Sequence, residues 1–118
     1  MKYQKKIHEN ILDNTKSLRE EAVIVFKTLR DNLCETLELY EKNSSNADKT
    51  FHVNEWVRND GGGGVSSILR GSIIEKAGVH LSTVYGQLPN GALNDQKSKE
   101  SDFWASGISV IIHPQSPF

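Results

Sequence analysis

The chain has 118 residues, of which 36% are hydrophobic, and this is enough for one domain with a core of modest size. Its 14 basic and 15 acidic residues nearly cancel, which argues against nucleic acid or an anionic membrane surface as a partner. Cys34 is the single cysteine, so no disulfide can form within the chain, and a cytoplasmic location is expected. No window approaches the roughly 20 apolar residues that a membrane span needs.

Apolar residues recur at three- and four-residue steps between residues 5 and 42, which predicts one amphipathic helix or two in succession. Cys34 falls within this pattern as a small apolar residue. Glutamates on the remaining face are expected to be solvated charges: Glu35, Glu38 and Glu41. The apolar positions that define the pattern are Ile7, Ile11, Leu18, Ala22, Val25, Phe26, Leu29, Leu33 and Leu37.

After the helical segment, the spacing of the apolar residues changes to that of β-strands. Residues 65–78 hold two short β-prone runs around Arg70-Gly71, which predicts a tight antiparallel hairpin. Residues 80–88 and 103–113 are a third and a fourth strand candidate, with a turn-rich loop between them. The expected fold class is α+β, with N-terminal helix or helices at 1–50 followed by an antiparallel β-meander at 51–118.

Four consecutive glycines stand at 61–64, although each glycine loses more conformational freedom on folding than any other residue. A phosphate-binding loop would lead into a helix, whereas this run leads into Val-Ser-Ser and a strand candidate. A flexible linker is the simple alternative, but Trp56 and Arg58 before the run favour an ordered turn or edge strand. Glycines in a strand mark a close approach of a ligand or of another backbone, so a flat, bulky ligand could lie there.

Two blocks of sequence carry a specific resemblance. The first is F-x-V-N-E-W-x-R-x-x-GGGG-V-S-x-x-L-x-G-x-x-x-EKAGV-x-x-S-x-V-x-G, at 51–86, and the second is FWASGISVIIHPQSP, at 103–117. In order and spacing they resemble the N-terminal part of the oxygen-dependent coproporphyrinogen III oxidases. The resemblance covers the helical segment only in general character.

This resemblance implies a reaction, a fold and an assembly. Family members convert two propionate side chains of the tetrapyrrole coproporphyrinogen III into vinyl groups, yielding protoporphyrinogen IX in haem biosynthesis. Molecular oxygen is the co-substrate, carbon dioxide is released, and no organic cofactor is required. The implied fold is a large antiparallel sheet flanked by helices, in a homodimer.

The substrate has an apolar macrocycle and four carboxylates, so its site needs a broad surface and fixed cationic or backbone donors. The resemblance assigns a substrate contact to Ser109. Gly62 and Gly63 are expected to leave the backbone surface open to the substrate. Arg58 or Lys76 is expected to lie near a propionate. Salt-bridged surface charge is the alternative for both cations.

Glu75 and Lys76 are adjacent in a strand candidate, so only one of them can face the site. A regular strand would place His113 on the same face as Ser109. The resemblance implies a divalent metal ligand at His113, with a strand-end histidine before the Pro114 turn as the competing interpretation, because a lone histidine holds no metal.

The family pattern continues beyond HPQSP into an H-x-N-x-R block with the proton-donating histidine, and this chain ends at Phe118. We therefore expect no catalytic residue within the chain, an incomplete C-terminus, and no activity of the chain alone. The alternative function is a non-catalytic α+β module that binds tetrapyrrole weakly or self-associates through an exposed sheet edge.

Overall fold

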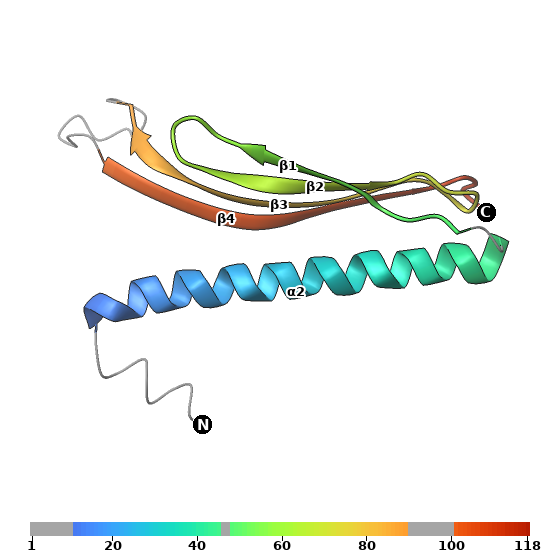
Figure 1. Ribbon diagram of the computed structural model, residues 1–118, viewed down its shortest axis with the longest axis horizontal. Coiled ribbons are helices and arrows are strands. Elements are labelled where there is room, and N and C mark those ends of the chain that lie inside the picture. The colour runs from blue at the N-terminus through green and yellow to red at the C-terminus, as the bar shows by residue number, and fades with distance from the viewer. Residues whose placement is uncertain (1–10, 46–47, 90–100) are drawn as a thin grey trace, which may run out of the picture.

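The computed structural model of the chain describes residues 11–45, 48–89 and 101–118 (Figure 1). In these ranges helix α2 (Ile11–Ser45) precedes the strands β1 (His52–Val57), β2 (Gly62–Leu69), β3 (Ile74–Leu88) and β4 (Ser101–Pro114). The strands form one antiparallel sheet in the order β1-β2-β3-β4, and α2 runs along one face of it. The predicted α+β class is confirmed. Among the described residues, no helix has the length and apolar character to cross a membrane.

Two details of the predicted elements are wrong. The second hairpin run and the third strand candidate are one continuous strand, β3, of 15 residues. The tight turn at Arg70-Gly71 is a longer connection, residues 70–73, closed by a hydrogen bond of 2.8 Å from the Gly71 N–H to the Ile74 carbonyl. The expected loop between β3 and β4 falls largely on 90–100, outside the described residues.

Fewer apolar residues of the helix pack against the sheet than its apolar pattern predicts. Ala22, Phe26 and Leu33 are partly buried, and Leu37 packs against the core. Other members of the expected apolar stripe stay exposed: Leu18 by 66%, Val25 by 60% and Leu29 by 44%. One sheet touches one side of a helix, so a stripe wider than that contact remains in solvent.

The core is small and lies at one end of the molecule. Leu69, Ile74 and Ala77 form a buried cluster against which Leu37 and Phe51 pack. The radius of gyration is 19.0 Å, whereas a compact domain of this length has about 13.5 Å. The chain is therefore an open two-layer arrangement in which one sheet face has no covering layer among the described residues.

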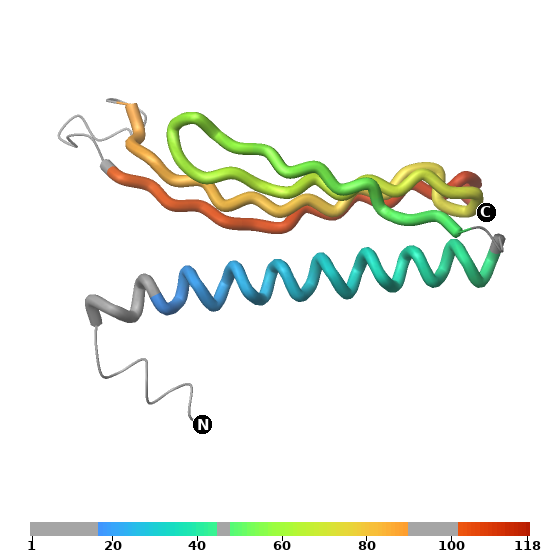
Figure 2. The backbone as a smooth tube through the Cα atoms, viewed as in Figure 1, coloured from blue at the N-terminus to red at the C-terminus, as the bar shows by residue number. Residues whose placement is uncertain are grey.

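Glu41 links the helix to the β2–β3 connection. Its side chain is completely buried, and its carboxylate accepts hydrogen bonds from the backbone N–H groups of Ser72, Ile73 and Ile74, at 3.0 Å for Ile73 and 3.1 Å for Ile74. A side chain at Gly71 would clash with this carboxylate. Figure 2 shows the β2–β3 connection beside the last turns of α2.

The expectation of three solvated glutamates is thus right for Glu35 and wrong for the other two. One turn before Glu41, Glu38 is half-buried and accepts a hydrogen bond of 2.8 Å from the Phe51 N–H at the entry to β1. Both carboxylates serve as acceptors for backbone donors that the sheet leaves open.

Cys34 lies on the sheet-facing side of α2 as a half-buried free thiol. Burial raises its pKa above the ordinary value for a thiol, although the Arg30 guanidinium opposes this shift. The residue therefore stays a protonated thiol that packs as a small apolar group, as expected.

We predict that Glu41→Ala destabilises the chain by about 3–5 kcal/mol, because it leaves buried backbone donors without an acceptor. Glu41→Gln keeps one oxygen acceptor and should lose about half as much. Urea unfolding followed by circular dichroism measures both values. Glu35→Ala on the exposed side of the same helix is the matched control and should change stability by less than about 0.5 kcal/mol. Equal effects of the two alanine variants would contradict the anchoring role of Glu41.

Candidate functional site

The two faces of the sheet differ because alternate residues of a strand point to opposite sides. The register places Ser67, Val79 and Val110 in one row on the side that packs on α2. We call the opposite side the outer face. No helix or strand covers it in the described ranges, and Figure 1 shows it turned away from α2.

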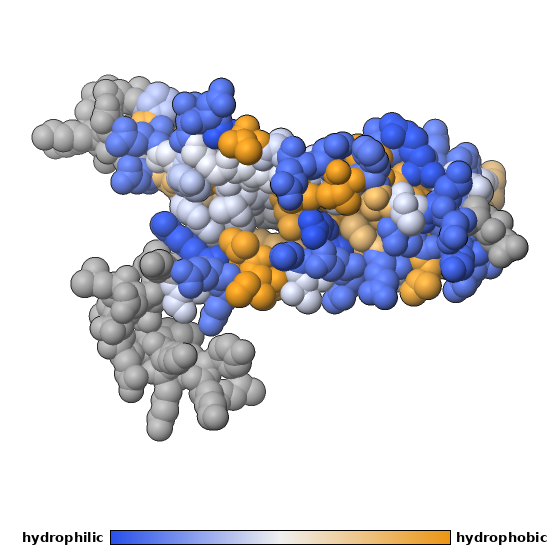
Figure 3. Space-filling model, viewed as in Figure 1, coloured by the Kyte–Doolittle hydropathy of each residue, from blue (hydrophilic) through white to orange (hydrophobic). Residues whose placement is uncertain are grey.

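The outer face has a floor of small residues. The register brings Gly64, Ser82 and Gly107 into one cross-strand row and Gly62, Val84 and Ala105 into the next. An added Cβ at Gly107 would meet no atom within 4 Å, so the space above it is open. Figure 3 shows surface of near-neutral hydropathy over the sheet at the end that carries the β1–β2 turn, with hydrophilic groups around it.

Aromatic residues border this floor. An added Cβ at Gly64 would lie 2.7 Å from Cε2 of Trp56, so the indole covers that glycine. Phe103 is the outer-face partner of Gly86 near the start of β4. This part of the outer face therefore combines exposed backbone with aromatic side chains at its border, as a flat apolar ligand requires.

The glycine run is explained first by its own backbone. Gly61 and Gly62 have φ values of +131° and +86°, which side chains of L-residues rarely adopt. Added Cβ atoms would collide with the Thr83 carbonyl at Gly62 and with the Trp56 carbonyl at Gly63. Moreover, the register assigns Gly63 to the side that packs on α2, so Gly62 and Gly63 do not share a face.

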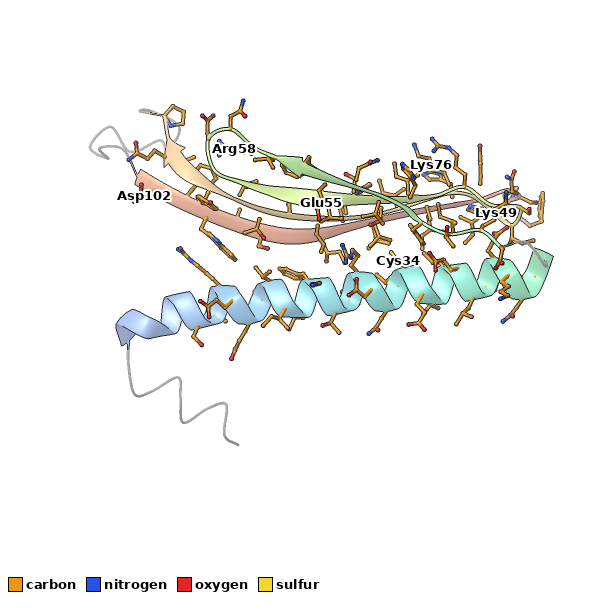
Figure 4. The ribbon with its side chains drawn as sticks, viewed as in Figure 1. Cys34, Lys49, Glu55, Arg58, Lys76 and Asp102 are labelled. Carbon is orange, nitrogen blue, oxygen red and sulfur yellow. The ribbon has the colours of Figure 1, made fainter. Side chains whose placement is uncertain are left out.

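Arg58 already has partners at the β1–β2 turn. Its guanidinium donates to the Tyr85 carbonyl at 2.8 Å and the Gly61 carbonyl at 3.3 Å, and it lies 3.9 Å from the Asp60 carboxylate. It also stacks over Phe103 at 5.5 Å from the ring centroid. The side chain retains 33% exposure, so it holds the turn while presenting part of its charge at the rim (Figure 4).

Lys76 and His113 lie together at the other end of the outer face. They are cross-strand partners, and Figure 4 shows Lys76 on the side of the sheet away from α2. A bulge between Ile74 and Lys76 lets Ile74 enter the core while Lys76 points outward. Glu75 is the extra residue of this bulge, and its side chain is exposed.

Ser109 and His113 lie on the same outer face, because the register of β4 is unbroken between them. However, His113 is an exposed single imidazole beside the Lys76 ammonium, and the described residues contain no group of three potential metal ligands. These residues do not fit a metal by themselves.

Sequence reasoning missed His80 and Gly107. His80 lies in β3 directly opposite Ser109, and its Nδ1 atom is buried without a hydrogen-bond partner. Gly107 precedes Ser109 by one period of the strand. Because side chains two positions apart in a strand share a face, the position of Ser109 predicts that Gly107 lies on the same face. His80 lies on another strand, so placing it beside Ser109 requires the pairing register.

The family model for coproporphyrinogen III oxidase matches residues 21–118 of this chain. The chain is 34% identical over 113 residues to coproporphyrinogen-III oxidase 1, chloroplastic, of Arabidopsis thaliana, covering 89% of this chain and 28% of that relative. It is 39% identical over 98 residues to the oxygen-dependent coproporphyrinogen-III oxidase of Rickettsia africae, covering 78% and 35%.

A third relative, the oxygen-dependent coproporphyrinogen-III oxidase of Drosophila melanogaster, is 33% identical over 116 residues, covering 91% of this chain and 29% of the relative. The chain thus spans about a third of the length of these curated relatives. Since the family match includes α2 from residue 21 onward and all four strands, the chain belongs to the coproporphyrinogen III oxidase family.

Proposed function

We propose that this chain supplies the substrate-binding face of an oxygen-dependent coproporphyrinogen III oxidase. The observation that carries the proposal is the outer face itself, with open space above Gly107 and cationic side chains at both ends. Arg58 lies at one end, and Lys76 and His113 lie at the other. Ser109 lies between them, where the family resemblance implies a substrate contact.

The chemistry of the substrate matches this layout. A porphyrinogen is an apolar macrocycle with carboxylates around its rim, so it needs a bare apolar floor and donors at the edge. Gly62 contributes to that floor, whereas Gly63 acts through the backbone of the turn. Lys76 and the exposed part of Arg58 are the proposed propionate contacts at the two ends.

The proposed reaction balances without an organic cofactor. Each of two propionates loses carbon dioxide and the equivalent of a hydride to become a vinyl group. One molecule of oxygen takes up the four electrons and, with two further protons from solvent, becomes two water molecules. The chain's own residues would bind and orient the tetrapyrrole, and no catalytic group is assigned to them.

The proposed location is the cytoplasm, where a free thiol such as Cys34 stays reduced. Cell fractionation with an antibody against the chain tests this location, and recovery from an organelle or a membrane fraction would refute it.

The open space above Gly107 can be tested by filling it. Coproporphyrin III should quench the tryptophan fluorescence of the chain on binding, because Trp56 borders the floor. Gly107→Val fills the open space and should weaken binding at least tenfold, or about 1.4 kcal/mol, with the thermal midpoint lowered by no more than a few degrees. Val110→Leu adds volume on the other side of β4 and should bind as the unmodified chain does. Equal affinities of all three would refute the proposed face.

Turnover by this chain and by a chimera tests the proposed role in the enzyme. The chain alone, in aerated buffer with coproporphyrinogen III, should give no protoporphyrin fluorescence, because loss of one acid or positioned donor already costs about 10²- to 10⁴-fold. A chimera of the Rickettsia africae oxidase that carries residues 21–118 of this chain in place of its matching segment should turn over. A folded but inactive chimera, or product from the chain alone, would contradict the proposal.

Self-association through the edge of the sheet is a second candidate function. In the described residues β4 pairs only with β3, and Val110, Ile111 and Ile112 are 40–53% exposed. A long apolar edge strand is a template for a second chain. Two copies could pair their β4 strands around a two-fold axis.

A charge placed on β4 tests this edge. Ile111→Lys should shift the chain from dimer to monomer by light scattering, because a lysine on an edge strand opposes pairing. Val25→Lys, which changes an exposed apolar residue of α2, is the control and should leave the dimer intact. A monomeric unmodified chain, or a dimer that survives Ile111→Lys, would exclude this association.

A further inference from the structure

A row of polar residues crosses the whole outer face. Asn54 pairs with Ser66, Ser66 with His80, and His80 with Ser109, so each strand contributes one member at the same level. Neighbouring strands are about 4.8 Å apart, so the row is about 14 Å long. It lies one strand period from the row of small residues that contains Gly107. We call these four residues the polar row.

The polar row has unused hydrogen-bonding capacity. Within the described part of the chain, none of its four side chains takes part in a hydrogen bond, although Ser66 and His80 are half-buried. The Nδ1 atom of His80 is buried without a partner. Because Nδ1 is buried, a ligand on the outer face can reach the imidazole only through Nε2, which is not among the buried unpaired atoms.

The absence of a side chain at Gly78 leaves room for the His80 ring. An added Cβ at Gly78 would lie 2.7 Å from Nε2 of His80, so the imidazole lies over Gly78 along β3. Gly78 is itself buried. The ring lies in the middle of the sheet, where a ligand that spans several strands can contact it.

The charges of the outer face favour an anion. His52, Lys76 and His113 point to this face by register, and Arg58 lies at its rim. The strand carboxylates placed by register point to the side of α2: Glu55 and Asp102. Two further carboxylates lie beside cations, Asp60 next to Arg58 and Glu75 at the bulge next to Lys76.

We propose that His80, with Ser66 and Asn54, binds a propionate of the tetrapyrrole and so orients the macrocycle over Gly107. The imidazole N–H, the serine hydroxyl and the asparagine amide each donate a hydrogen bond, and an ionised carboxylate only accepts. This inference rests on the proposed function and adds contacts beside Ser109. One propionate would lie at the polar row, in addition to those proposed at Lys76 and Arg58, and the macrocycle would extend toward the Arg58 end of the face.

Two probes separate carboxylate recognition from packing. Coproporphyrin III carries four carboxylates, and its tetramethyl ester carries the same macrocycle without charge. Both are titrated in the same buffer with non-ionic micelles, with tryptophan quenching as readout. His80→Phe keeps a flat ring but removes the donor, and it should weaken binding of the acid about tenfold while leaving the ester unchanged. His80→Asn keeps a donor and should stay within about threefold of the unmodified chain.

The outcomes distinguish this inference from the proposed function. If Gly107→Val abolishes binding but His80→Phe does not change it, the outer face binds ligand and the role of His80 is refuted. If His80→Phe weakens the acid and the ester equally, His80 acts by packing alone, and the inference is again refuted. If the unmodified chain binds neither probe, the proposed function itself fails. Should His80→Phe not fold, Ser66→Ala replaces it, with about a threefold loss expected for the acid only.

Discussion

The buried carboxylate of Glu41 is the contact on which the arrangement of helix and sheet depends. It lies at the only well-packed end of the described molecule, where Leu69, Ile74 and Ala77 form the core. An ionised group is costly to bury unless several donors surround it, and the N–H groups of the β2–β3 connection supply them. Removing the carboxylate or changing the connection would therefore separate the two layers at their strongest contact.

The position of the core at one end of the molecule explains the character of the rest of the sheet. Away from the core, the helix is held to the sheet by contacts such as the stacking of Arg19 over Trp104, at 5.1 Å from the ring centroid. The helix side of the sheet can also satisfy its own polar groups there, as Thr83 and Ser106 do at 2.9 Å. The core and the helix lie on that side, so the outer face can carry small and polar residues without loss of core.

The sequence predicts the helix, the antiparallel meander and the family, because each leaves a local signal of period, turn composition or motif. It does not predict the role of Glu41, since a glutamate in an amphipathic helix is ordinarily solvated and nothing local marks the backbone donors 31 residues away. It likewise places Ser109 and His113 on one face but leaves His80 unassigned. Which residues of two strands lie side by side depends on the pairing register, and the alternation of side chains along one strand does not give that register.

The bulge at the start of β3 has a consequence for changes of chain length. Glu75 is an extra residue that reverses the alternation, so that Ile74 and Lys76 point to opposite sides although they are two positions apart. In a chain lacking Glu75, Ile74 and the lysine would be adjacent in a regular strand and would still point to opposite sides. Relatives shorter by one residue at this point would therefore keep both the core contact and the outward cation. Loss of one residue further along β3 would have a different effect: every side chain of β3 on one side of the deletion would point to the opposite face of the sheet.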